Sequence, residues 1–183
     1  KVVLKGKTTA ADLVTVTSTG SINGAGLVTG TTVDLNAVSG IGNTTPLNLA
    51  ATTITADTTN GNIDINNTLA TAVAVNSLTT GTGTITFDQS GGGAVTYGTA
   101  TTTAGSIVLT NTAAQLTVGT AVNAGGAGSD VTLTTTTSGN VVLTGTTTAA
   151  DLVTVTSAGN INGAGLVTGT TVDLNAVSGI GNT

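Results

Sequence analysis

The residues of this chain that could do chemistry are its eight aspartates, and calcium binding is the chemistry that one of them suggests. The run Gly125-Gly126-Ala127-Gly128-Ser129-Asp130 fits the first six positions of the nonapeptide GGxGxDxUx, in which backbone carbonyls and Asp carboxylates hold Ca²⁺ between turns. The large apolar residue of that pattern should stand two positions after Asp130, where the chain has Thr132. Neighbouring copies of the pattern are also lacking. A glycine-rich loop is therefore the preferred interpretation, and we expect no metal site and no cofactor.

The aspartates also form two spaced series. The intervals within each series are 21 to 23, and the members are Asp12, Asp34 and Asp57 in one, and Asp130, Asp151 and Asp173 in the other. Carboxylates stacked one strand apart would repel each other unless cations or solvent neutralised them. Because Asp34 lies between two strand residues and Asp12 precedes its strand, the register is inconsistent. We expect solvated positions on the outer face and in turns.

The side chains on which most enzymes depend are missing. The chain has no Glu, Arg, His, Cys, Met or Trp. It therefore lacks an imidazole base, a thiolate nucleophile, soft metal ligands and a bidentate phosphate clamp. Clustered Asp on a coil wall also serves β-helical polysaccharide lyases and hydrolases, but their usual Arg or Lys partners are missing over residues 8–183. We expect that the chain is not an enzyme.

The composition is threonine-rich and favours strands. Val, Ile and Thr make up 76 of the 183 residues, whereas good helix formers are few and 27 glycines interrupt any helical window. Leu, Ile, Val and Phe reach about 25 % of the chain, above the ~20 % that accompanies disorder. No apolar run approaches the length of a membrane span, so we expect no membrane insertion. A net charge of −5 without a basic patch argues against nucleic acid as a partner.

A near-exact internal repeat organises the chain. Residues 1–44 recur as 140–183, with 39 of 44 positions identical at an offset of 139. The five differences are Lys1/Asn140, Lys5/Thr144, Lys7/Thr146, Thr19/Ala158 and Ser21/Asn160. We interpret residues 1–139 as one tandem repeat block and 140–183 as the start of the next block. Together they would form a continuous single rod that is a fragment of a longer protein.

A shorter motif recurs inside the block, consisting of a glycine, a polar residue and then alternating apolar residues. It stands, at a regular interval of 22, at Gly61-Asn62-Ile63-Asp64-Ile65, Gly83-Thr84-Ile85-Thr86-Phe87 and Gly105-Ser106-Ile107-Val108-Leu109. Short apolar runs lie half-way between these motifs, so each period holds at least two short strands. The alternation directs Ile63 and Ile65, or Ile85 and Phe87, to one face of a strand.

Strands this short bury enough surface only when successive coils stack into one core. The prediction is an all-β fold with almost no helix: a β-solenoid whose coils have the length of this motif interval, about 22. Small aliphatic residues would lie inside, Thr, Asn and Asp outside, and glycine at the corners. Between Ile107 and Ile161 the interval of 54 can be divided as 24 plus 30 or as 34 plus 20. An all-β sandwich is the structural alternative, but it would not explain the repeat at 139.

Several runs resemble the coils of filamentous-haemagglutinin-type bacterial adhesins. They are Gly105-Ser106-Ile107-Val108-Leu109-Thr110, Gly128-Ser129-Asp130-Val131-Thr132-Leu133-Thr134 and Gly139-Asn140-Val141-Val142-Leu143-Thr144. Those adhesins are giant, repetitive surface or secreted proteins. The resemblance implies a right-handed parallel β-helix in an extracellular fibrous shaft at the bacterial cell surface, and it assigns no functional residues.

The expected function is therefore mechanical: a shaft segment of a cell-surface fibre, adhesin stalk or matrix filament. Its partner would be the protein itself, through end-to-end continuation and lateral association. The alternative is an adhesin module whose outer face binds a glycan or a receptor on a host or cell surface. Such sites usually use exposed aromatic rings, and only Phe87 and Tyr97 are available. Ice binding by Thr-x-Thr pairs is disfavoured, because their intervals of 31, 48 and 22 build no regular face.

Overall fold

Alternation of apolar and polar residues sets the inner and outer face of each strand. In β7 (Ile63–Asn67) Ile63, Ile65 and Asn67 are buried, while Asp64 and Asn66 are only partly covered. In β9 (Ile85–Gln89) Ile85 and Phe87 point inward in the same way. The predicted inward faces of these strands are confirmed.

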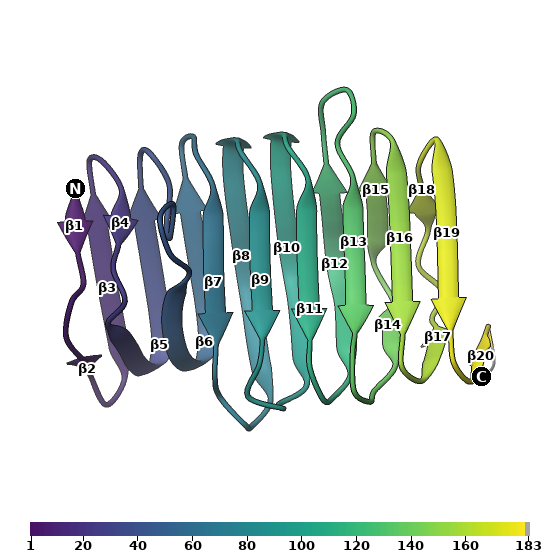
Figure 1. The fold of residues 1–183 in the computed structure, drawn as a ribbon, viewed down its shortest axis with the longest axis horizontal. Helices are drawn as coiled ribbons and strands as arrows, with labels where there is room; N and C mark the ends of the chain where they lie inside the picture. Colours follow the sequence, from purple (N-terminus) through teal and green to yellow (C-terminus); the bar gives the residue numbers. More distant parts are fainter. Residues whose placement is uncertain (182–183) are drawn as a thin grey trace.

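The computed structural model describes residues 1–181, and these strands stack as a β-solenoid of about eight turns with a ~22-residue spacing. Each coil has two walls (Figure 1). Strands of the front wall run downward in this view and strands of the back wall run upward, while the coil advances from the N-terminus at left to the C-terminus at right. This sense of winding is right-handed, as predicted. Residues 1–181 contain no helix.

The strands divide between the walls as follows. The front wall holds β1 (Val2–Val3), β2 (Thr8–Thr9), β4 (Ile22–Asn23), β7 (Ile63–Asn67), β9 (Ile85–Gln89), β11 (Ile107–Asn111), β13 (Val131–Thr135), β16 (Leu152–Ser157) and β19 (Thr171–Ala176). The back wall holds β3 (Leu13–Ser18), β8 (Val73–Thr82), β10 (Val95–Ala104), β12 (Leu116–Ala124), β14 (Val141–Leu143), β15 (Thr146–Ala149), β17 (Asn160–Asn162), β18 (Val167–Thr168) and β20 (Gly179–Ile180). Two long strands, β5 (Leu27–Ala37) and β6 (Leu47–Thr58), begin on the front wall and bend onto the back wall.

Neighbouring strands pair in parallel along the rod. On the front wall, Ile41, Ile63, Ile85 and Ile107 are partners in successive coils, so the interval between the sequence motifs is the length of one coil. On the back wall, Val14 pairs with Val33, which pairs with Ile54. The inward residues of all coils join one buried cluster that runs from Val14 to Ile161. One core therefore extends along the rod, because each coil buries its apolar residues against the next.

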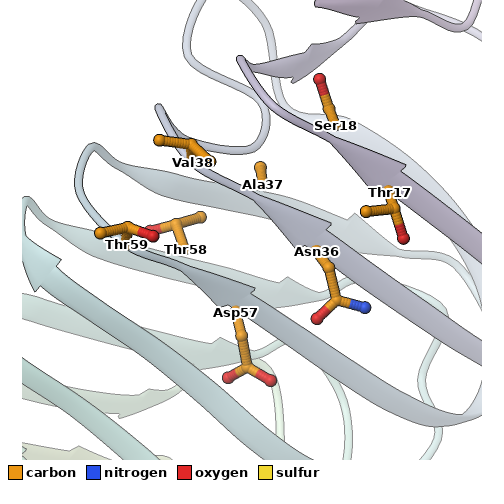
Figure 2. Close-up of a pocket in the computed structure, with 8 residues that line it drawn as sticks. All are labelled: Thr17, Ser18, Asn36, Ala37, Val38, Asp57, Thr58 and Thr59. Carbon is orange, nitrogen blue, oxygen red and sulfur yellow. The ribbon is translucent and has the colours of Figure 1, made fainter.

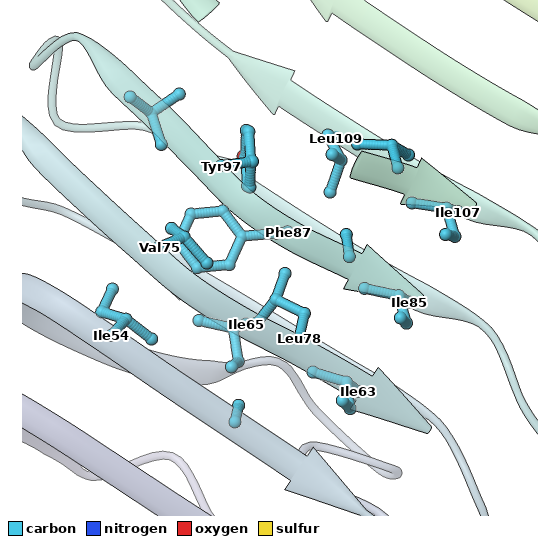
Figure 3. Packing of buried hydrophobic residues seen from close by; sticks show 14 of the residues in the cluster. Ile54, Ile63, Ile65, Val75, Leu78, Ile85, Phe87, Tyr97, Ile107 and Leu109 are labelled. Atoms are coloured by element: carbon cyan, nitrogen blue, oxygen red, sulfur yellow. The ribbon is translucent and has the colours of Figure 1, made fainter. Parts of the chain in front are cut away.

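The two aromatic rings lie inside this core. Phe87 on the front wall and Tyr97 on the back wall are fully buried, and their rings meet edge to face with centroids 5.7 Å apart (Figure 3). Such a pairing is a favourable aromatic geometry. The Tyr97 hydroxyl is buried without a hydrogen-bond partner. Burial, and secondarily the charge of Asp88, raises the pKa of Tyr97 well above its ordinary value.

Glycines form the corners where the back wall turns to the front wall. Gly61, Gly83 and Gly105 all have positive φ values, of 92°, 142° and 146°. A Cβ on Gly83 would lie 2.6 Å from the carbonyl carbon and oxygen of Gly61, in the neighbouring coil. Only glycine fits both the backbone conformation and the close stacking of corners. The prediction of glycine at the corners is confirmed.

Part of the polar inventory is buried, contrary to the expectation that Thr and Asn lie outside. At the end of several front-wall strands a polar side chain points inward, as Asn67, Gln89 and Asn111 do. The Asn67 amide bonds both the N–H (3.0 Å) and the carbonyl (3.1 Å) of Ala51, and also reaches the Gln89 amide oxygen (2.8 Å). Threonines such as Thr80 occupy the equivalent end of the back wall. These side chains satisfy backbone groups at corners where the strand ladder is interrupted.

The two copies of the repeated segment lie on opposite walls. β3 of the first copy is on the back wall, and β16, identical in sequence, is on the front wall. For the same reason both divisions of the interval between Ile107 and Ile161 are wrong. Ile107 pairs with Val131 on the front wall, whereas Ile161 pairs with Val141 on the back wall.

Candidate functional site

The two aspartate series do not form columns of carboxylates. In the first series, Asp34 lies between Thr15 and Thr55 in neighbouring strands. In the second series, Asp173 pairs with Thr154. These carboxylates are thus flanked by hydroxyl side chains rather than by another carboxylate, which removes the repulsion that a column would create.

The Gly125–Asp130 segment is a loop that leaves the coil between β12 and β13 (Figure 1). Gly126 and Gly128 take positive φ values of 85° and 74°. The Asp130 carboxylate accepts the backbone N–H of Leu152 at 3.1 Å, and the Ser129 hydroxyl accepts that of Gly105 at 3.1 Å. Both polar side chains therefore tie the loop to adjacent coils. Over residues 1–181 no three His, Cys, Asp or Glu side chains gather as a metal site would require.

The aromatic rings cannot stack on a ligand in this structure, because Phe87 and Tyr97 are both fully buried. Threonine pairs do align locally on the front wall, where Thr132 pairs with Thr154 and Thr134 with Thr156. The row through Thr132 ends at Val108, and the row through Thr134 continues to Thr110 and ends at Asp88. No regular threonine face forms along the described walls.

A shallow groove lies where the back wall ends, and we call it the corner groove. It has a volume of about 370 Å³ and is lined by Thr17, Ser18, Asn36, Ala37, Val38, Asp57, Thr58 and Thr59 (Figure 2). Thr17, Asn36 and Asp57 are register partners in three successive strands, so a hydroxyl, an amide and a carboxylate lie side by side. Val38 adds an apolar side chain that is 44 % exposed. The arrangement can form hydrogen bonds and one apolar contact with a ligand.

A second groove, which we call the acidic groove, follows from a short insertion in the front wall. Ile41 pairs with Ile63 and Leu47 with Ile65, so the residues between Ile41 and Leu47 bulge out as a loop containing Pro46. The groove beside this loop has a volume of about 480 Å³ and is lined by Ala25, Thr45, Pro46, Asn48, Asp64, Ile65, Asn66, Thr86 and Asp88.

Two carboxylates dominate the acidic groove. Partial burial raises the pKa of Asp64 and the pKa of Asp88 above their ordinary value, because desolvation disfavours the charged form. One oxygen of Asp88 is buried without a hydrogen-bond partner. Asn66 links the neighbouring coils, since it donates to Asn48 (3.3 Å) and accepts from Ser90 (2.6 Å). The groove suits a neutral or cationic, hydrogen-bonding ligand.

The sequence predicted neither groove. The interval of 24 between Asp64 and Asp88, slightly longer than one coil, is the signal that places them diagonally in adjacent coils. The insertion after Ile41 could have indicated the rim of the groove, because the run Gly42–Pro46 lacks the alternation of a strand.

Within residues 1–181 there is no helix long and apolar enough to span a bilayer. No protein-family model, no curated protein and no solved structure matches the chain.

Proposed function

We propose that the chain is a non-catalytic segment of a structural shaft in a giant extracellular bacterial repeat protein. The parent would be a cell-surface fibre, an adhesin stalk or a matrix filament. Its role would be to hold other parts of the parent protein at a distance. Its partner would be the same protein, through end-to-end continuation of the solenoid and lateral association of rods.

The observation that carries this proposal is the continuity of the strand ladder across the block boundary. β12 of the first block pairs with β14 and β15 of the second, and β13 pairs with β16. The second block therefore extends the same core and the same walls. Tandem blocks can lengthen such a rod indefinitely, because each coil contacts only its neighbours.

The composition supports a location outside the cell. From residue 8 onward the chain has no Lys or Arg, so trypsin-like proteases have no site there. The chain also has no Cys and hence no redox-sensitive bond. The resemblance to haemagglutinin-type shafts is in keeping with this location.

Electron microscopy and fibre diffraction of a tandem array of the block test the proposal. The expected result is a smooth thin filament with a ~4.8 Å layer line along its axis. Compact globules, or particles whose length does not grow with block number, would refute the shaft. Circular dichroism on the same sample confirms that the strands have formed.

The second candidate function is binding of a glycan or a receptor by the outer face, and the two grooves are the observation that favours it. Thr, Asn and Asp side chains can hydrogen-bond sugar hydroxyls, although no aromatic ring is available to stack on them. A glycan array probed with the chain, and with an Asp88→Ala variant as control, tests this function. Reproducible signals that the variant loses would favour a binding module over an inert shaft.

A further inference from the structure

Equivalent residues of the two copies build the same hydrogen-bonded corner on opposite walls of the coil. On the back wall the Ser18 hydroxyl donates to the carbonyl of Ser21 and accepts the N–H of Gly20, both at 3.1 Å. On the front wall the Ser157 hydroxyl donates to the carbonyl of Asn160 at 2.9 Å and accepts the N–H of Gly159 at 3.2 Å. These bonds are local. The sequence of this segment therefore forms the same local corner on either wall.

Strand pairing within the repeated segment is also preserved. Thr15 pairs with Asp34 on the back wall, and Thr154 pairs with Asp173 on the front wall, in the same relative register. The second copy thus repeats the local structure of the first copy after a half-turn about the rod axis.

The half-turn follows from an odd number of wall segments in the block. From β3 to β16 the chain crosses from one wall to the other thirteen times, and each crossing is one half-coil. It visits the back wall at β3, β5, β6, β8, β10, β12 and β14–β15. Between these visits it is on the front wall, at β4, at the start of β6 and at β7, β9, β11 and β13, before it reaches β16. The tandem block therefore advances the rod by six and a half coils, or ~31 Å at ~4.8 Å per strand.

A surface feature follows the same rule. A groove of about 380 Å³ lies at the equivalent end of the front wall, where Leu174 and Ile180 line it in place of Asp57, Thr58 and Thr59. Five lining residues correspond at the offset of 139: Thr17, Ser18, Asn36, Ala37 and Val38 in the first groove, and Thr156, Ser157, Asn175, Ala176 and Val177 in the second. β3 ends at the top of the back wall and β16 at the bottom of the front wall, so the grooves open on opposite sides (Figure 1).

We propose that the block is a half-turn repeat, so that a tandem array presents the same outer surface, corner groove included, alternately on two opposite sides of the rod. The inference rests on the proposed shaft function, which requires tandem blocks. A partner that recognises one block meets the same surface on the other side ~31 Å further along. Two blocks together restore the original face, apart from any gradual twist of the stack. Such a fibre can bridge partners on both sides, which a block of whole coils could not do.

Spin-label distances in the chain itself test the placement, and the absence of Cys makes labelling specific. The reference positions are Thr86 on the front wall and Thr99 on the back wall. Register partners place Thr154 three strand spacings from Thr86 on the front wall, and Thr15 four spacings from Thr99 on the back wall. These same-wall distances are ~14 Å and ~19 Å between backbones.

Four double-cysteine variants combine T15C or T154C with T86C or T99C. We expect short distances for 15–99 and 86–154. The pairs 15–86 and 99–154 should be longer by ~10 Å or more, because the walls are ~10 Å apart and the labels project outward. If both copies were close to the same reference, the half-turn repeat would be overturned while the solenoid stood. If the 15–99 pair lost its short distance, the stacked coil itself would fail, and with it both the shaft and the inference.

Discussion

Replacing Asn67 by alanine should destabilise the solenoid by about 3 kcal/mol or more, because each buried group left unpaired costs at least about 1 kcal/mol. The side chain is fully buried and forms three hydrogen bonds, two with the backbone of Ala51 and one with Gln89. Its amide acts as a neighbouring strand would, because Ala51 pairs with Gly30 on one side but the pairing with β7 on the other side ends at Leu49. Without it, two backbone groups and one amide oxygen lose their partners inside the core, which gives the lower bound.

Urea denaturation followed by circular dichroism measures the loss, and amide hydrogen exchange locates it. Exchange at the Ala51 N–H should accelerate by ~10²-fold or more, since about 1.4 kcal/mol corresponds to a factor of ten. Local exchange matters because stacked coils can open segmentally. The exposed Asn76 provides the matched control, and N76A should leave stability within about 0.5 kcal/mol of the parent. If N67A were equally neutral, with unchanged exchange at Ala51, the role assigned to this amide would be wrong.

Three further predictions concern the corner, the core and the acidic groove. G83A should cost ~1–3 kcal/mol, because its φ of 142° and the neighbouring corner exclude a Cβ, whereas G6A, with no atom within 4 Å, should be neutral in thermal melts. Y97F should raise the melting temperature, since it removes a buried hydroxyl that lacks a partner; a lower melting temperature would contradict this. Burial raises the pKa of Asp64 and of Asp88 above 3.8 in the folded chain. The stability that these two carboxyls contribute while protonated is therefore lost as the pH rises from about 4 through their raised folded-state pKa values. D88N should therefore stabilise the chain at pH 7 more than at pH 4 in urea titrations, and an equal effect at both pH values would contradict the shift.

The repetitive walls were predictable from short sequence patterns. The motif around Gly61, Gly83 and Gly105 indicates both the corner and the two inward residues that follow it. The regular interval between these motifs predicts the length of each coil, because parallel coils keep their register. Alternation suffices here, since the strands inside the stack have one buried face and a slip by one residue would expose the whole apolar set.

The corners and the outer surface were less predictable. Asn67 is buried because it replaces a missing strand partner, and this need appears only when Ala51 lies beside it. Tyr97 lies inside because the opposite ring, Phe87, complements it across the core. The acidic groove depends on a loop that bulges between two paired positions, and alternation says nothing about such a loop. The placement of Val153 on the wall opposite Val14 depends on counting half-coils, which the motif around a single wall does not reveal.

The equivalence of the Ser18 and Ser157 corners also bears on how the gene can change in length. A duplication or deletion does not need to span a whole number of coils to leave the fold intact. The 139-residue block covers thirteen half-coils, and the strands that follow it still pair correctly with those before it. Unequal recombination between near-identical blocks should therefore produce working proteins, because it adds or removes whole blocks of thirteen half-coils. Units with an odd number of half-coils would reverse the side on which everything downstream is displayed.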